Sequence, residues 1–311
     1  MTQRPRRGDI EAARDRIGSA VRWTPVVDLG GLPGVAARVV LKLELLQHSG
    51  SFKARGALNS VLSLAEDGRG VCAASGGNHA GGVAWAARRA GVPADLFVPS
   101  VATPVKIARI RDYGGRVHLV EGFVKEALVT CSEHAARENL TQVHPYDTFE
   151  TVCGAGTMGL EIAEQVPDAT LVVLGCGGGG LYSGTAIALA ESATRVQPVE
   201  PELCPTLAEA LAAGGPVEVA VGGVASDALG AARVGDIAYA VAVENGVEPV
   251  LISESDIVSA RRLLWREARV LAEPGACVAL AAVVSGQVVV PAGETIVVVI
   301  SGGNNEAFPQ G

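Results

Sequence analysis

Three observations predict an α/β protein with mostly parallel sheets. Short runs rich in Val, Leu and Ile alternate along the chain with segments whose apolar residues recur at helical spacing. Strands separated by helices pair in parallel through crossover connections. Only 4% of the 311 residues are aromatic and 49% are hydrophobic, a composition that suits helices packed closely on a sheet.

The expected elements follow from local signals in chain order. Asp9 can cap a helix that runs to about Val21, and Thr24-Pro25 ends this helix and starts a loop. After this loop, apolar runs rich in Val and Leu predict strands, and segments of helical spacing that follow short turns predict helices. The expected strands are residues 37–43, 71–74, 95–98, 116–120, 195–199 and 295–300 with another from residue 171, and the expected helices are residues 58–65, 83–90, 104–113, 124–139 and a segment ending at residue 190.

Charge and hydropathy argue against several classes of partner. The net charge is −8, the pI is about 5.2 and no basic stripe is present, so we expect no nucleic acid partner. Residues 1–7 lack the apolar core of a signal peptide. The uncharged runs 170–190 and 274–293 are interrupted by Gly or Pro, which favours buried strands and helices over membrane spans. Six scattered cysteines without a CxxC pair indicate a reducing compartment, so we expect a soluble cytoplasmic protein without a membrane partner.

One lysine has an unusual setting. Lys53 follows Ser51 and Phe52 and precedes a segment of helical spacing, so we expect it in the opening turn of a helix, after a glycine turn. Ser51 and Phe52 would hold the amine against the protein, and loss of water lowers the pKa of a lysine. A neutral amine can attack a carbonyl carbon and form a Schiff base. An exposed lysine on a helix's first turn is the ordinary alternative.

Two glycine-containing turns and one strand end could bind a ligand. In residues 75–79 (Ser-Gly-Gly-Asn-His), backbone amides before a helix can receive an anion such as a carboxylate, although an ordinary surface turn has equal support. In residues 171–181 a strand runs into four consecutive glycines and then a helix, which suits a phosphate. Ser301 ends a strand at the edge where ligands bind in parallel sheets.

The four-glycine loop also leaves a dehydrogenase open. Gly175, Gly177 and Gly180 fit the dinucleotide fingerprint. Glu200 ends the next strand, at about the position of a ribose-binding acid. Four glycines without a bulky residue between them suit a bare phosphate at least as well.

Together these stretches resemble the serine/threonine dehydratase branch of the fold-type-II pyridoxal-phosphate enzymes, related to tryptophan synthase β and cysteine synthase. The resemblance covers nearly the whole chain, and the joint order of short motifs carries it. The motifs are Thr24-Pro25, Lys42-Leu43-Glu44 with Gln47, Ser51-Phe52-Lys53, Gly77-Asn78-His79, His144-Pro145-Tyr146-Asp147, Gly154 to Thr157, Gly177 to Leu181, Val199-Glu200-Pro201, Glu273-Pro274-Gly275-Ala276 and Ser301-Gly302-Gly303-Asn304.

The resemblance implies pyridoxal 5'-phosphate as cofactor and a role for each matching residue. Lys53 matches the lysine that holds the cofactor as a Schiff base and moves the Cα proton. Phe52 matches the residue packed on the pyridine ring, Asn78 the partner of the phenolic oxygen, and Ser301 the hydroxyl facing the pyridine nitrogen. The phosphate loop is matched by Gly177, Gly178, Gly179, Gly180 and Leu181. The loop for the substrate carboxylate is matched by Ser75, Gly76, Gly77, Asn78 and His79.

The fold that the resemblance implies has two open, twisted, mostly parallel sheets flanked by helices, with a small domain inserted in a larger one. We expect residues 68–143 to form the small domain, which carries the substrate-carboxylate loop. Residues 1–67 and 144–311 would form the large cofactor-binding domain. The resemblance also implies a homodimer.

The sequence departs from the family pattern at three places. Gly76 stands where Ser or Ala is usual, and residues 224–230 replace an Asp-Gly-containing pattern beside the substrate side chain. Thr206 stands where cation-binding relatives carry a second acid, so we expect no metal ligand among the site residues. Substrate identity is therefore open.

These observations predict a pyridoxal-phosphate-dependent dehydratase, an ammonia-lyase that converts L-threonine or L-serine to a 2-keto acid and ammonia by α,β-elimination. A β-replacing synthase or an amino-acid racemase of the same fold is an alternative, although such synthases usually carry Thr at the position of His79. From other classes, an NAD(P)-dependent dehydrogenase and a non-catalytic binding protein stay open.

Overall fold

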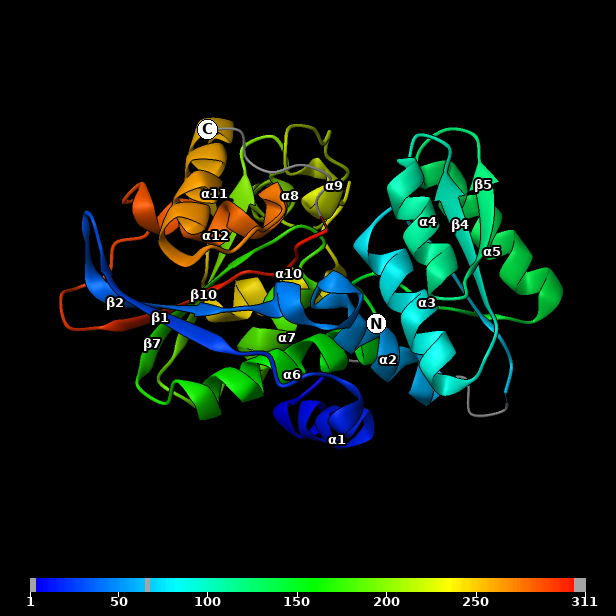
Figure 1. Ribbon diagram of the computed structural model, residues 1–311, viewed down its shortest axis with the longest axis horizontal. Coiled ribbons are helices and arrows are strands. Elements are labelled where there is room, and N and C mark those ends of the chain that lie inside the picture. Colours follow the sequence, from blue (N-terminus) through cyan, green and yellow to red (C-terminus); the bar gives the residue numbers. More distant parts are fainter. Residues whose placement is uncertain (1–3, 65–67, 305–311) are drawn as a thin grey trace.

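The computed structural model describes residues 4–64 and 68–304 and has two lobes, each built on one sheet (Figure 1). The larger sheet has six strands in the order β1-β2-β10-β7-β8-β9, and the smaller has four in the order β5-β4-β3-β6. The strands are β1 (Val26–Leu32), β2 (Val35–Lys42), β3 (Val71–Ala74), β4 (Ala94–Pro99), β5 (Arg116–Val120), β6 (Thr141–Gln142), β7 (Ala169–Gly175), β8 (Arg195–Pro201), β9 (Val250–Ile252) and β10 (Thr295–Val299).

Helices cover both sheets, as the alternating sequence pattern predicts. The α-helices are α1 (Arg7–Ile17), α2 (Lys53–Leu64), α3 (Asn78–Ala90), α4 (Pro104–Asp112), α5 (Val124–Glu138), α6 (Phe149–Gln165), α7 (Gly180–Ala188), α8 (Thr206–Ala213), α9 (Ser226–Leu229), α10 (Asp236–Asn245), α11 (Glu254–Ala268) and α12 (Pro274–Val284). The 3₁₀ helices are η1 (Gly18–Ala20), η2 (Glu44–Leu46) and η3 (His48–Gly50).

The pairing within the described sheets confirms the predicted fold class. The β1–β2 hairpin is antiparallel, and the other strand pairs are parallel. Parallel strands that are buried on both faces require continuous apolar runs, and β3, β4 and β10 are buried along their whole length. At their carboxyl ends, β3 runs into the loop of residues 75–79, β7 into the four-glycine loop and β10 into Ser301.

Several elements differ from the expectation; among them, α1 ends at Ile17 instead of about Val21, and its N-cap is Arg6, with Asp9 in the first turn. Residues 26–32 form the edge strand β1 instead of a loop, because pairing with β2 outweighs the poor strand propensity of Asp28 and two glycines. Helix α3 begins at Asn78 and not at residue 83. Gly82 lowers helix propensity, yet a Cβ there would lie 3.2 Å from the Lys53 carbonyl group, so close packing of α3 on α2 favours glycine. The expected helix end at Ala65 and the expected domain end at residue 67 lie outside the described residues.

Helix α2 joins the two lobes. Its apolar residues Ala57, Leu58 and Val61 belong to the buried core of the smaller lobe, while α2 also packs on α6 of the larger lobe. Figure 1 shows α2 between the lobes. The first residue of α2, Lys53, is therefore held where the lobes meet.

The first uncharged run is largely buried, as predicted, whereas the second is buried through α12 and then continues as a largely exposed stretch. Residues 170–190 contain most of β7, the glycine loop and α7, and residues 274–293 begin with α12. No helix within residues 4–64 or 68–304 has both the length and the apolarity needed to cross a bilayer.

Candidate active site

The start of α2 is tied to the end of β10. Ser51 forms an isolated antiparallel bridge with Gly302, and the Phe52 backbone N–H donates to the Ser301 carbonyl oxygen at 3.0 Å. Two segments far apart in the sequence thus lie side by side. Lys53 follows directly, so its position depends on a backbone connection to the strand end that carries Ser301.

Lys53 begins α2, as the sequence predicts. Its Nζ donates to the Pro145 carbonyl oxygen at 2.6 Å and lies 5.1 Å from the centroid of the Phe52 ring. Burial lowers the pKa of Lys53 to about 8. The neutral amine is therefore far more abundant near neutral pH than in an exposed lysine.

The four-glycine loop between β7 and α7 has no room for side chains. A Cβ at Gly178 would overlap the Tyr146 ring, and one at Gly180 would lie 2.6 Å from the Tyr146 carbonyl oxygen. Gly179 has φ +84°, and its Cβ would overlap Ala238. Close packing and backbone conformation therefore both require glycine here.

The loop also opens α7, whose first residue is Gly180. The first backbone N–H groups of a helix have no partner within the helix and carry partial positive charge, so they favour an anion. Gly178 lines the same cavity as Lys53. A helix start suited to an anion and the Lys53 amine thus border the same cavity.

The loop of residues 75–79 ends at the N-terminus of α3. The Gly77 N–H donates to the Ser75 Oγ at 3.1 Å. His79 is buried, and its Nε2–H donates to the Val143 carbonyl oxygen at 2.9 Å, which defines the tautomer. Burial, reinforced by the charge of Lys53, lowers the pKa of His79 to about 3. His79 is therefore neutral, and its hydrogen bond to Val143 stabilises the conformation of the loop.

Asn78 makes two side-chain contacts that sequence reasoning missed. Its Nδ2 donates to Glu273 Oε1 at 2.6 Å, and its Oδ1 accepts from Asn304 Nδ2 at 2.6 Å. Glu273 is the N-cap of α12, and burial raises its pKa to about 7. The motif around Glu273 is visible in the sequence, but its contact with Asn78 spans nearly 200 residues. The amide of Asn78 would have to exchange these contacts to bind a cofactor oxygen.

These residues surround a cavity of about 290 Å³ between the lobes. One wall carries Lys53, Tyr146 and Gly178, and residues 75–79 form another. A narrow recess beside it is lined by Phe52, Lys53, Gly180 and Leu181. Ser301 is buried and lines neither space, although its backbone holds Phe52.

An ion pair between the two lobes lines this cavity. Lys106 of α4 in the smaller lobe contacts Asp227 of α9 in the larger lobe. Both side chains line the cavity, together with Ser226 and Ala228. Part of the unusual segment 224–230 thus lines the same cavity as Lys53, where it can contact a substrate side chain.

Glu200 does not take the position that a dinucleotide site needs. Its buried carboxylate accepts from the backbone N–H groups of Leu207 at 2.7 Å and Ala208 at 3.0 Å. The Thr206 hydroxyl lies 3.0 Å from this carboxylate and 2.8 Å from the Gly177 carbonyl oxygen. Burial raises the pKa of Glu200 to about 7 despite these bonds. The acid therefore anchors α8 to the glycine loop and does not face a ribose.

A buried cluster of four charged side chains supports the start of α2. Arg55 is fully buried and bonds to Glu44 at 2.8 Å and to Glu161 at 2.6 Å. The Lys42 Nζ donates to Glu161 at 2.7 Å. Two cations thus balance two anions, which is the condition for burying them. The motif Lys42-Leu43-Glu44 pointed to this region, but sequence reasoning missed Arg55 and Glu161.

Comparisons with known proteins give matches over nearly the whole chain. A family model described as "Pyridoxal-phosphate dependent enzyme" matches residues 17–302. Phenylserine dehydratase of Ralstonia pickettii is 37% identical over 96% of this chain and 93% of its own length. L-threonine ammonia-lyase of Thermotoga maritima is 35% identical over 95% of this chain and 75% of its own length. The structure of maize serine racemase has a TM-score of 0.91 and 29% identity, covering 98% of this chain and 95% of that chain.

Proposed function

The chain belongs to the family of pyridoxal-phosphate dependent enzymes, and on this premise we propose that it is a dehydratase that converts a small β-hydroxy amino acid to a 2-keto acid and ammonia. One observation carries the proposal: a partly buried lysine lines a cavity together with the turn of residues 75–79 before α3 and with the side-chain-free glycine loop. The family membership confirms the predicted cofactor and removes the dehydrogenase alternative.

The residues present fit pyridoxal phosphate. The first-turn amides of α7 and the glycines before them suit the phosphate group, and Lys53 supplies an amine for the aldehyde carbon. Phe52 lies in the adjoining recess, where it can support a ring. When bound, the cofactor supplies an electron sink that makes the Cα proton of an amino acid acidic.

The protein's own groups then account for the remaining steps. The first backbone N–H groups of α3, which begins at Asn78, orient the substrate carboxylate, because such groups have no partner within the helix. The Lys53 Nζ, once neutral, takes the Cα proton. The β-hydroxyl group takes up one proton and leaves as water, which balances the proton that Lys53 removed from Cα, and addition of one water to the remaining imine releases ammonia and the keto acid. Ser301, which the resemblance matches to the group facing the ring nitrogen, carries a neutral hydroxyl and no carboxylic acid, which would favour elimination, although its side chain lines neither the cavity nor the recess.

L-threonine and L-serine are the proposed substrates, and phenylserine is a second candidate. The cavity wall of the smaller lobe carries the apolar residues Val101, Ala102 and Val124, and Ala228 and Ala231 lie on the opposite lobe. Such a lining accepts an apolar β-substituent. The 37% identity to a phenylserine dehydratase supports the same extension. Comparing kcat/KM for the three amino acids, with keto acid release as the readout, tests the proposal, and no keto acid from any of them would refute it.

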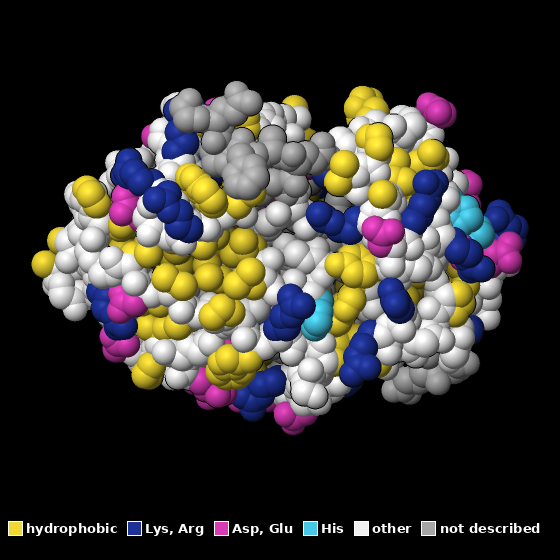
Figure 2. Space-filling model, viewed as in Figure 1, with side chains coloured by type: hydrophobic (Ala, Val, Ile, Leu, Met, Phe, Trp, Pro, Cys, Tyr) yellow, Lys and Arg dark blue, Asp and Glu magenta, His cyan; other side chains and the backbone are white. Residues whose placement is uncertain are grey.

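We also propose a cytoplasmic homodimer. The six cysteines are free and buried, as expected in a reducing compartment. Hydrophobic side chains gather on the larger lobe in the face shown in Figure 2, a feature typical of association surfaces. Light scattering on the purified protein measures the oligomeric state, and a monomer at micromolar concentration would contradict the proposal.

A serine at position 76 is expected to introduce racemase activity. Racemisation needs an acid–base group on each face of Cα, and Lys53 supplies one face only. A Cβ at Gly76 would lie 3.2 Å from the Ala102 Cβ, so Gly76→Ser requires a shift of a few tenths of an ångström. We expect D-serine among the products of L-serine for Gly76→Ser and little D-serine for the wild type, measured by chiral chromatography.

Gly76→Ala is the matched control for this variant. It adds the same Cβ without the hydroxyl, so it should alter the elimination rate but release no D-serine. Equal D-serine from Gly76→Ala and Gly76→Ser, or abundant D-serine from the wild type, would show that another group donates the proton.

Removal of Mg²⁺ or Ca²⁺ is expected to leave turnover unchanged. Glu200, the acid that would hold such a cation, is already bonded to two amides of α8 and lies next to the Thr206 hydroxyl. A hard cation would find few free oxygen ligands there, so activity in a chelator should change by no more than about twofold. Assays before and after chelation, and with each ion restored, measure this. A large loss that either ion reverses would contradict it.

A further inference from the structure

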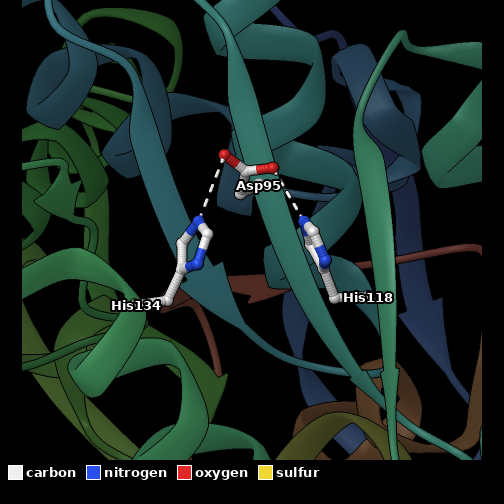
Figure 3. A group of neighbouring side chains, drawn as sticks. All are labelled: Asp95, His118 and His134. Carbon is white, nitrogen blue, oxygen red and sulfur yellow. Dashed lines mark hydrogen bonds and ion pairs between the residues drawn. The ribbon is translucent and has the colours of Figure 1, made fainter. Parts of the chain in front are cut away.

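A second cluster of ionisable side chains lies in the smaller lobe, outside the catalytic cavity. Asp95 projects from β4, His118 from β5 and His134 from α5, and the two imidazoles lie on opposite sides of the carboxylate (Figure 3). The proposed reaction uses none of these residues. Three elements thus bring two imidazoles and one carboxylate together at a single point.

The distances in the cluster suit a small cation. The His118 Nε2 lies 2.8 Å from Asp95 Oδ1, and the His134 Nε2 lies 3.6 Å from Asp95 Oδ2. All three ligand atoms lie within 4.8 Å of one another. Two ligand atoms on a tetrahedral zinc ion are separated by ~3.3 Å, given bond lengths of about 2.0–2.1 Å. Small side-chain rotations would therefore bring the three atoms to coordination distance.

The surroundings define an inner and an outer side. The Phe97 ring stacks on the His118 imidazole with centroids 4.8 Å apart and contacts the His134 ring at 5.1 Å. The Asp95 side chain is only 6% exposed, whereas that of His118 is 40% exposed. An ion would therefore be held against an apolar floor, and water could complete its coordination from the solvent side.

Two arginines compete for the same groups. Arg116 donates to both oxygens of Asp95, at 2.9 and 2.7 Å, and Arg137 donates to the His134 Nδ1 at 2.8 Å. Both arginine side chains are more than 60% exposed, so both can turn into solvent at little cost. A metal bound through the His134 Nε2 needs a proton on Nδ1, so it would displace Arg137 as well as Arg116.

We propose that Asp95, His118 and His134 form a binding site for a divalent cation of the zinc class. Two imidazoles and one carboxylate are a ligand set that Zn²⁺ accepts, whereas Mg²⁺ and Ca²⁺ prefer oxygen ligands alone. The ion joins β4, β5 and α5, and it displaces the arginine contacts of the ion-free state. Asp95 lies near the start of β4, while Pro99 at its other end lines the catalytic cavity. The ion therefore stabilises the smaller lobe and stays outside the chemistry.

Equilibrium dialysis of the chelator-treated holoenzyme against Zn²⁺ tests the site. We expect one zinc-class ion bound per chain through these residues and a higher melting temperature with Zn²⁺, because binding to the folded state stabilises it. His118→Ala and His134→Ala should each weaken binding roughly tenfold or more. His48→Gln is the matched control, because it removes an imidazole that stacks on Trp85 away from this cluster, and it should bind as the wild type does.

Arg116→Gln is expected to change Zn²⁺ affinity in the opposite direction to the histidine variants. A gain in affinity cannot result from a variant that merely fails to fold. Loss of the competing cation should tighten Zn²⁺ binding, whereas a purely structural ion pair would predict no gain. Co²⁺ in place of Zn²⁺ should show the visible bands of a four-coordinate ion, and these bands should be absent in His118→Ala. Unchanged Zn²⁺ affinity in both histidine variants, or no gain in Arg116→Gln, would overturn the proposal.

Discussion

Replacing Lys53 with alanine is expected to reduce turnover about a thousandfold or more, because one residue serves as both nucleophile and base. The fold should persist, since the Lys53 side chain makes one hydrogen bond, to a backbone carbonyl, and lies at the first turn of α2. The glycine loop should still bind the cofactor weakly. Keto acid release by the purified variant measures the loss, and circular dichroism serves as the fold control.

A second measurement separates the role of Lys53 from a general loss of function. Borohydride treatment of the wild-type holoenzyme should fix the cofactor covalently on the peptide that contains Lys53, as mass spectrometry would show. Lys106→Ala is the matched control, because it removes another lysine that lines the cavity. Covalent labelling elsewhere, or turnover by Lys53→Ala close to that of the wild type, would overturn the assignment.

The lowered pKa of Lys53 predicts a pH dependence for cofactor uptake by the apo-protein. The neutral amine is the reactive form, so its fraction rises as the pH increases through about 8, the pKa that burial gives to Lys53. Uptake of pyridoxal phosphate should therefore accelerate between about pH 7 and about pH 9, and it should level off earlier than an exposed lysine near pKa 10.4 would. Stopped-flow absorbance measures this rate.

Replacing Arg55 with methionine is expected to lower the free energy of unfolding by roughly 3–5 kcal/mol, because it leaves two buried carboxylates without their main partner. Although burial lowers the pKa of Arg55, Glu44 and Glu161 raise it overall. For Glu44, burial by itself raises the pKa of the carboxyl group. The positive charges of Arg55 and Lys42 have the larger effect, so the pKa of Glu44 is lowered overall. These opposing effects show how closely the charges depend on one another. Chemical denaturation of wild type and variant measures the difference.

Arg14→Met is the matched control for Arg55→Met. Arg14 pairs with Glu164 at 3.0 Å, yet these side chains are 43% and 56% exposed. An exposed pair contributes about 0–1 kcal/mol, so this variant should stay close to the wild type. Adding Glu44→Gln to Arg55→Met should recover part of the loss, because one unpaired charge is removed. Equal losses in Arg55→Met and Arg14→Met would show that burial does not control the energetics of this cluster.

Sequence alone determined the fold class and the place of Lys53 in its first helical turn. Both depend on local signals: apolar runs separated by helical spacing, and a lysine between a glycine turn and an amphipathic segment. The four consecutive glycines likewise marked the loop before α7. Such features can be predicted from the sequence because they depend on neighbours only a few residues away.

Only the tertiary structure decided which charged and polar groups meet. Strand β1 forms because β2 supplies its backbone hydrogen-bond partners. The Glu200 carboxylate is hydrogen-bonded because α8 packs against it and donates a backbone N–H group. Arg55 and Glu161 form a hydrogen bond although they are 106 residues apart in the sequence. Asp95 lies close to His118 and His134, which belong to two other elements. Hydrophobic periodicity shows that a position is buried, but it does not say what a buried charge will contact. That partner is selected by the packing of whole helices and strands, because a buried charge is stable only where another element supplies its opposite.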